Sequence, residues 1–122
     1  MRIDLHAHSN VSDGTETPAD VMASAARAGL DVVALTDHDS TAGWAEASAA
    51  AATYGVALVP GMEVSCRTEE GISVHLLSYL HDPTHPGLLE EITKAKDSRQ
   101  TRAERMVTIL AEDYPLTWDD VI

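Results

Sequence analysis

The sequence predicts an α/β fold in which short strands alternate with helices. Two kinds of observation support this class: β-branched apolar runs are separated by alanine-rich segments of helical length, and glycines or prolines mark the boundaries. Because a helix-length segment separates each of the first three runs from the next, we expect these strands to be parallel. The 122 residues, of which 44% are hydrophobic, suffice for one globular core.

The N-terminal elements are predicted from local signals. Residues 2–8 are expected to form the first strand. Thr17-Pro18 is expected to start a helix, with threonine as the cap and proline at the first helical position, and Gly29 to end it. A near-continuous apolar run at residues 31–36 then predicts a second strand that is covered on both faces.

The next elements complete a β-α-β-α-β unit. Residues 41–54 predict an alanine-rich helix that stops at Gly55, and residues 56–59 predict a third short strand that Pro60-Gly61 ends. Two extended runs follow, residues 64–67 and 72–77, with only four residues between them. No helix fits in that gap, so we expect a hairpin.

The C-terminal part of the chain is predicted to be helical. Residues 87–112 are expected to form a helix with one break near Asp97-Ser98. Thr117 is expected to open another helix, because an acidic residue stands three positions later as in a capping box.

The charge of the chain limits its partners. The formal net charge is −12, with 20 acidic and 8 basic residues. Such a protein is not expected to bind double-stranded nucleic acid, although divalent cations held by carboxylates would let it accept a small phosphorylated substrate. Cys66 is the single cysteine, and neither a signal peptide nor a long apolar run is present. We therefore expect a cytoplasmic protein that does not bind membranes.

Two histidines near the N-terminus are the first candidate metal ligands. Side chains alternate along a strand, so His6 and His8 should project from the same face, together with Asp4. We expect Asp4 to accept the second ring N–H of a ligating histidine.

Further candidates follow the other strands. His38 and Glu63 come after the second and third strands, Asp13 lies in the first β-α loop, and His75 lies in the last extended run. Active sites of parallel α/β barrels form at the C-terminal ends of strands, and mixed imidazole and carboxylate ligands suit Mn²⁺, Fe²⁺ or Zn²⁺ better than Ca²⁺. The alternatives are that Asp13 only shapes a turn, that Glu63 is solvated and that His75 is a core histidine.

Two smaller sets of residues have open roles. Asp37 and Asp39 flank His38 and either support the ligands or cap the following helix. Arg99 and Arg102 lie one helical turn apart and either clamp a second phosphate or form a solvated face. They belong to a cluster that holds five of the eight basic residues within twelve positions: Lys94, Lys96, Arg99, Arg102 and Arg105.

Four short segments carry a family resemblance. They are Asp-Leu-His-Ala-His-Ser (4–9) with Ser-Asp-Gly (12–14), Leu-Thr-Asp-His-Asp-Ser (35–40), Pro-Gly-Met-Glu-Val-Ser (60–65) and Val-His-Leu-Leu-Ser-Tyr (74–79). In order and spacing they resemble the first motifs of the PHP phosphoesterases, the polymerase and histidinol phosphatase family. The resemblance covers essentially the whole chain.

The resemblance implies both a fold and a metal centre. Residues 1–86 would form the N-terminal part of a distorted, TIM-like seven-stranded (β/α) barrel, and residues 87–122 the start of a helical insertion, with the remainder of the barrel outside this sequence. Two to three divalent ions, Mn²⁺ foremost and Zn²⁺ or Fe²⁺ as alternatives, would form a centre that later histidines and aspartates complete. In this family pattern the first ion takes His6, His8 and Glu63, the second takes Glu63 and His75, and the third takes Asp13 and His38.

The resemblance also implies an activity. The chain looks most like stand-alone members that remove phosphate from nucleoside 3′,5′-bisphosphates and degrade short RNA from the 5′ end. Asp13, His38 and Glu63 would then be catalytic in a metal-assisted hydrolysis of a phosphoric ester. The alternatives are a histidinol-phosphate phosphatase, a polymerase-associated accessory domain and a non-catalytic metal-stabilised module.

Overall fold

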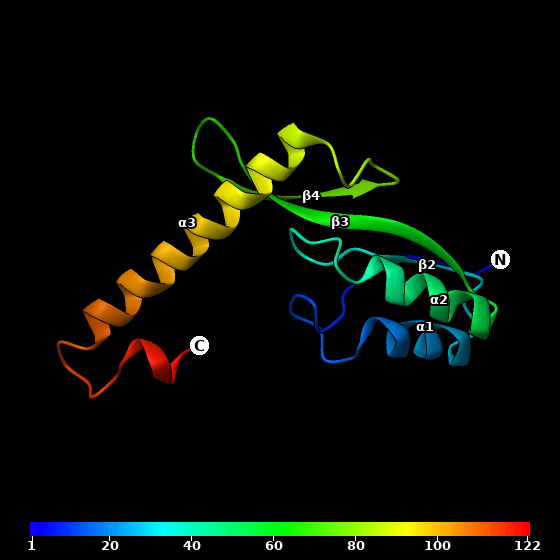
Figure 1. Cartoon of the computed structure of the whole chain (residues 1–122), viewed down its shortest axis with the longest axis horizontal. Coiled ribbons are helices and arrows are strands. Elements are labelled where there is room, and N and C mark those ends of the chain that lie inside the picture. Colours follow the sequence, from blue (N-terminus) through cyan, green and yellow to red (C-terminus); the bar gives the residue numbers. More distant parts are fainter. The chain divides into compact units, whose positions relative to one another are not determined.

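Strands and helices alternate along residues 1–85 of the computed structural model, which describes all 122 residues. The chain divides into two units, Met1–His85 and Pro86–Ile122. Figure 1 labels the helices and strands. The first unit contains β1 (Ile3–Ala7), α1 (Pro18–Arg27), β2 (Val32–Leu35), α2 (Trp44–Tyr54), β3 (Ala57–Arg67) and β4 (Ser73–Tyr79), and the second contains α3 (Pro86–Leu110) and the 3-10 helix η1 (Trp118–Asp120).

The sheet has the strand order β1-β2-β3-β4. β1 pairs with β2, and β2 with β3, in parallel, whereas β3 and β4 form the predicted antiparallel hairpin. The Tyr79 hydroxyl of β4 donates a hydrogen bond of 2.6 Å to the Leu5 carbonyl of β1. Because β1 and β4 are the two edge strands, this bond shows that the sheet curls toward closure, as at the start of a TIM-like barrel.

The core of the first unit lies between the sheet and the two helices α1 and α2, which run side by side along one face (Figure 1). Val33 and Leu35 of β2 are buried there with Met22 of α1 and Ala47 of α2. α1 has the predicted cap, since Thr17 Oγ1 accepts the Asp20 N–H at 3.1 Å. This packing leaves the opposite face of the sheet for the candidate ligands.

The prediction that Pro60-Gly61 ends the third strand is wrong, because β3 continues to Arg67. Pro60 is the last residue that pairs with β2, and Gly61 is the first that pairs with β4. The proline therefore lies where the strand changes neighbour, and its carbonyl still accepts the Leu80 N–H at 2.9 Å. A Cβ atom at Gly61 would lie 2.9 Å from Thr36 Cγ2, so glycine permits the close approach to the neighbouring strand end.

Two other predicted boundaries also need correction. α2 begins at Trp44 and not at Thr41, because Gly43 is its cap residue. α3 has no break near Asp97-Ser98 and runs unbroken for 25 residues. The acidic and hydroxyl side chains there lie on an exposed stretch of the helix, where they do not interrupt the backbone hydrogen bonds.

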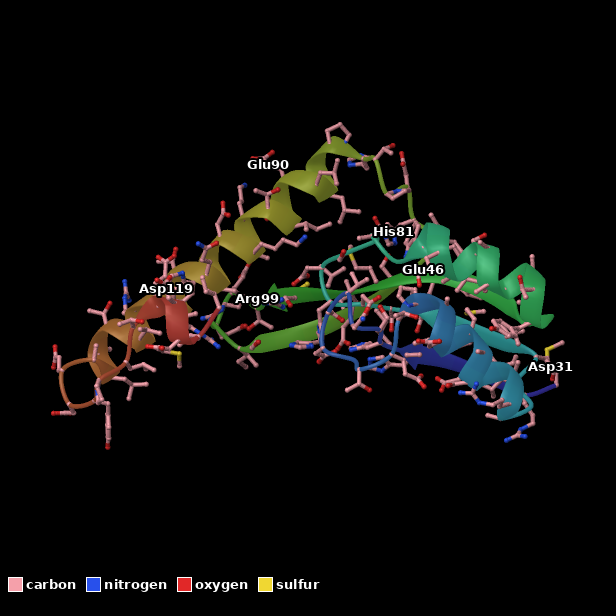
Figure 2. All side chains as sticks on the ribbon, turned by 60° about the horizontal axis from the view of Figure 1, so that its bottom comes forward. Asp31, Glu46, His81, Glu90, Arg99 and Asp119 are labelled. Atoms are coloured by element: carbon pink, nitrogen blue, oxygen red, sulfur yellow. The ribbon has the colours of Figure 1, made fainter.

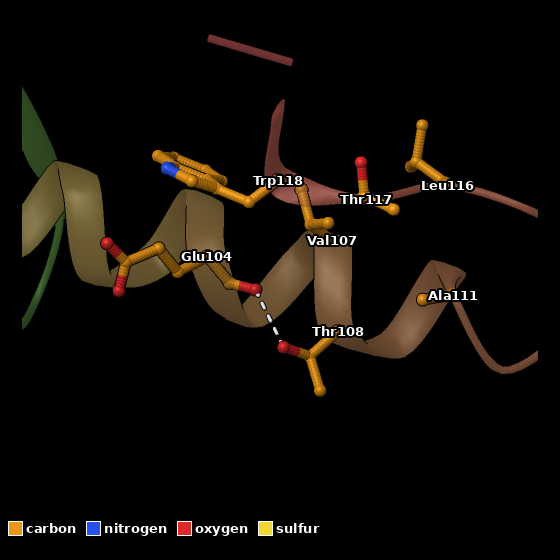
Figure 3. Close-up of a pocket in the computed structure, with 7 residues that line it drawn as sticks. All are labelled: Glu104, Val107, Thr108, Ala111, Leu116, Thr117 and Trp118. Carbon is orange, nitrogen blue, oxygen red and sulfur yellow. Dashed lines mark hydrogen bonds between the residues drawn. The ribbon is translucent and has the colours of Figure 1, made fainter. Parts of the chain in front are cut away.

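The second unit ends in a short capped turn. Thr117 and Asp120 form the predicted capping box, with both the Thr117 N–H and hydroxyl donating to Asp120 Oδ2 at 2.7 Å, although the helix η1 is only one turn long. Figure 3 shows the apolar groove between η1 and α3, lined among others by Val107 and Trp118. No helix in the structure combines the length and the apolar character required to cross a bilayer.

Candidate metal centre

His6 and His8 reach the same carboxylate group, as the alternation along the strand predicts. His6 Nε2 lies 2.9 Å and His8 Nε2 2.7 Å from Glu63 Oε2. The expected role of Asp4 is wrong: its Oδ1 accepts the backbone N–H of His6 at 3.0 Å and not a ring N–H. β1 and the residue directly after it therefore supply the two imidazoles, and Asp4 stabilises the backbone just before His6.

Asp13 lies in the loop after β1 and faces two imidazoles. Its Oδ1 is 2.6 Å from His8 Nδ1, and its Oδ2 is 3.2 Å from His38 Nε2. The loop turns sharply, because the Gly14 N–H donates to the Ser9 carbonyl at 2.8 Å. A Cβ atom at Gly14 would approach the His8 carbonyl oxygen to 2.6 Å, so this turn requires glycine. Asp13 therefore does more than shape a turn.

His38 and Glu63 are neighbours through their backbones. They form an isolated parallel bridge beyond the end of β2. The Glu63 N–H donates to the Asp37 carbonyl, and the Asp39 N–H donates to the Glu63 carbonyl, each at 3.1 Å. This bridge places His38 Nε2 3.7 Å from Glu63 Oε2.

His75 completes the set from β4. Its Nδ1 lies 2.8 Å from Glu63 Oε1, and its side chain is 47% exposed, so it is not a core histidine. The Glu63 side chain is only 8% exposed and contacts four imidazoles, so the alternative of a solvated glutamate is wrong as well.

The two carboxylates are held in their ionised forms. Burial raises the pKa of Glu63, but hydrogen bonds with His6 and His75 outweigh it and lower that pKa from 4.5 to about 2. The hydrogen bond from His8 is the main cause of the lowered pKa of Asp13. Both groups are thus available as anionic ligands across the physiological pH range.

These residues form three groups suited to cations. In each group the possible ligand atoms lie within 4.8 Å of one another: His6, His8 and Glu63; His8, Asp13 and His38; and His38, Glu63 and His75. His8 Nε2 is buried and close to Glu63 Oε2, yet the contact lacks hydrogen-bond geometry. Clustered imidazole nitrogens and carboxylate oxygens, one of them a buried nitrogen without a hydrogen-bond partner, fit a transition-metal ion or Mn²⁺.

Hydrogen bonds around the ligands involve residues whose roles the sequence left open or did not reveal. Asp37 is buried and accepts bonds from Ser9 and Ser12, while Asp39 Oδ1 accepts the Ser65 N–H at 2.8 Å. These aspartates hold the ligand-bearing segments and do not cap α2, whose N-terminus has no side-chain cap. Sequence reasoning missed Ser9 and Ser12, for which the only signal was their position between His8 and Asp13.

Arg99 and Arg102 lie on α3, in the second unit, and both are exposed. All six predicted metal ligands lie in the first unit, Met1–His85.

The comparison with protein families decides the family. The model of the PHP domain matches residues 4–117, which include all six candidate ligands and nearly the whole chain. The chain belongs to the PHP domain family.

Two relatives with named enzyme activities are similar to this chain over most of its length. The chain is 42% identical over 104 residues to a 3′,5′-nucleoside bisphosphate phosphatase of Chromobacterium violaceum. The aligned region covers 85% of this chain and 36% of that protein. It is 38% identical over 102 residues to a 5′-3′ exoribonuclease of Haemophilus influenzae. The aligned region covers 84% of this chain and 37% of that protein. The chain thus spans little more than a third of the length of these PHP relatives.

A solved structure of similar sequence agrees in fold. A protein of Bifidobacterium adolescentis assigned as a metal-dependent phosphoesterase superimposes with a TM-score of 0.89 at 40% sequence identity, covering 99% of this chain and 42% of that one. The curled sheet and its helices therefore correspond to part of that larger structure.

Proposed function

We propose that the protein is a metal-dependent phosphoesterase that removes the 3′-phosphate from nucleoside 3′,5′-bisphosphates and acts on short 5′-phosphorylated RNA. The observation that carries this proposal is the convergence of four imidazoles on the Glu63 carboxylate, with Asp13 beside two of them. The similarity to a bisphosphate phosphatase and to an exoribonuclease supports the choice of substrates.

The three ligand groups suggest how the metals would be held. His6, His8 and Glu63 would hold one ion, and Glu63 would share a second with His75, to which His38 is also close. Asp13 and His38 would hold a third, together with His8. Bound ions of this kind activate water near neutral pH and stabilise charge on the phosphate oxygens.

The residues of the chain contribute position and charge to the hydrolysis. In this reaction the oxygen of water bonds to phosphorus, the bond from phosphorus to the 3′ oxygen breaks, and the leaving oxygen takes up a proton. Glu63 is the common anionic partner and sets the spacing of the groups, while Asp13 and His38 face each other across 3.2 Å and fix one end of the cluster. Catalysis then depends on all three residues.

The first test compares substrates. We expect Mn²⁺-dependent release of phosphate from adenosine 3′,5′-bisphosphate by the full-length protein, and a loss of at least about 100-fold in Asp13→Asn, since a metal ligand is removed. The matched control is Asp31→Asn: Asp31 directly precedes β2, outside the three candidate metal groups, so this variant should keep full activity. Faster turnover of histidinol phosphate would favour the alternative phosphatase, and metal binding without any turnover would favour a non-catalytic module.

The second test concerns the proposed phosphate clamp on α3. If Arg99 and Arg102 bind the phosphate that is not cleaved, Arg102→Ala should raise KM for the bisphosphate about 10-fold or more and change little for a nucleoside 3′-monophosphate. Lys94→Ala is the control, because Lys94 is already paired with Glu90 and Glu91 on the same helix. Equal losses with both substrates would reject the clamp.

A further inference from the structure

Asp37 is a buried carboxylate that none of the three candidate metal groups contains. It is 2% exposed. Its Oδ1 accepts the Ser9 N–H and the Ser12 hydroxyl, and its Oδ2 accepts the Ser9 hydroxyl, each at 2.7 Å. Three short bonds to one buried anion hold the start of the Asp13 loop in one position.

The same residue also contacts the other ligand-bearing segments. Its carbonyl accepts the Glu63 N–H at 3.1 Å, and it directly precedes His38. Asp37 therefore joins the loop after β1, the end of β2 and the middle of β3. The bonds toward β3 are made by the backbone, whereas the bonds toward the loop depend on the side chain.

Because only the bonds toward the loop need the Asp37 side chain, the three candidate metal groups should depend on that side chain to different degrees. The group His38, Glu63 and His75 consists of residues on β3, β4 and the backbone bridge, and the group His6, His8 and Glu63 adds residues on β1 and directly after it. The group His8, Asp13 and His38 also needs the loop, since Asp13 is the residue after Ser12. Loss of the Asp37 side chain releases the loop but leaves the backbone bridge intact.

We propose that Asp37 is a positioning residue: through Ser9 and Ser12 it holds Asp13 against His38 and so controls the metal position that contains Asp13. This inference rests on the metal centre of the proposed function and deepens it, since it assigns one of the metal positions a separate support. It does not depend on which phosphate ester is hydrolysed.

The experiment measures bound metal. The full-length wild type and variants are loaded with Mn²⁺, and stoichiometry and affinity are determined by elemental analysis and calorimetry. In Asp37→Ala we expect the Mn²⁺ affinity of one class of sites to fall by about 10- to 100-fold. This is the range found when a residue that supports a metal ligand by hydrogen bonds is mutated. The remaining sites should keep their wild-type affinity. Ser12→Ala, which removes one of the three bonds, should weaken the same class by a smaller factor.

Two further variants separate positioning from charge and from general stability. Asp37→Asn keeps the oxygen that accepts the Ser9 N–H and the Ser12 hydroxyl, so it should retain most of the affinity. Asp31→Ala is the matched control, because Asp31 Oδ2 accepts the Arg2 N–H at 2.6 Å and also joins β1 to β2. Figure 2 labels Asp31 beside the C-terminal ends of α1 and α2. This variant should bind metal like the wild type.

The outcomes distinguish the possible failures. Wild-type binding in Asp37→Ala, an equal loss in all classes of sites, or the same loss in Asp31→Ala would overturn the positioning role. If Asp37→Ala does not fold, Ser12→Ala and Asp37→Asn test the positioning role in its place. Wild-type Mn²⁺ affinity in Ser12→Ala, or complete loss of the affected sites in Asp37→Asn, would overturn that role. A wild type that binds no Mn²⁺ would instead overturn the metal centre of the proposed function.

Discussion

At the scale of single residues, Glu63 combines burial with contacts to imidazoles from three segments of the chain. Its two oxygens lie 2.7–3.7 Å from nitrogens of His6, His8, His38 and His75. A buried carboxylate is costly unless such partners compensate for its lost hydration. The cluster therefore stabilises the anion and places one carboxylate in two of the three candidate metal groups.

The lowered pKa of Glu63 predicts a pH dependence of stability in the metal-free protein. The pKa is about 2 in the folded state against 4.5 for the free group, so the unfolded chain takes up the proton first. The stabilisation is complete above about pH 4.5 and is lost as the pH falls toward 2. Urea unfolding at several pH values should show this loss in the wild type and not in Glu63→Gln.

A surface glutamate provides the control for this pH dependence. Glu69→Gln, in the exposed turn between β3 and β4, makes the same change of charge outside the cluster and should unfold with the wild-type pH dependence. If Glu63→Gln retained the wild-type pH dependence, the cluster would not be the cause.

At the scale of elements, β3 connects the parallel and antiparallel parts of the sheet. It pairs with β2 through Pro60 and with β4 from Gly61 onward. The Trp44 indole N–H donates to the Gly61 carbonyl at 2.9 Å and fixes the start of α2 against this crossing. Glu63 follows two residues later, so its position depends on the crossing.

Gly61→Ala should destabilise the fold through overcrowding. The added Cβ would lie 2.9 Å from Thr36 Cγ2 and 3.0 Å from the Ser78 carbonyl oxygen. We expect a loss of about 1–3 kcal/mol in the free energy of unfolding, measured by urea denaturation. Gly71→Ala is the control: its Cβ meets no atom within 4 Å, so only its positive φ of 83° opposes alanine, at about 1 kcal/mol. A smaller loss in Gly61→Ala than in Gly71→Ala would contradict the crowding argument.

At the scale of the whole molecule, metal binding and folding should be coupled. The candidate ligands come from four separated segments, so a metal ion that binds them favours the folded chain. Free Mn²⁺ at 100 times its dissociation constant should add about 2.7 kcal/mol per site, and each kcal/mol corresponds to roughly 4 °C in Tm for a chain of 122 residues. Thermal unfolding with Mn²⁺ and with excess EDTA measures the difference.

Histidine variants test whether the candidate ligands cause this stabilisation. His38→Ala, which belongs to two of the groups, should reduce the Mn²⁺-dependent rise in Tm, whereas His85→Ala, outside all three groups, should retain it. An equal rise in both variants would mean that Mn²⁺ stabilises the protein elsewhere.

The alternation of elements and all six candidate ligands could be predicted from the sequence, because apolar runs, caps and residues at strand ends are local patterns. The expected hairpin is present for the same reason, since four residues cannot contain a crossover helix. The extension of β3 through Pro60 could not be predicted, because proline usually ends a strand and only the change of partner at Gly61 makes it acceptable. The seven-stranded barrel remains a prediction.

The sequence by itself determined which residues carry ligand chemistry and on which strands and loops they lie, since side-chain periodicity and turn signals act over a few residues. Only the tertiary structure decided that Glu63 is the common partner of four histidines, and that Asp37 bonds to a serine 28 positions away. The physical reason is that such contacts depend on how distant segments are brought together by the curl of the sheet, and no local pattern in the chain encodes that distance.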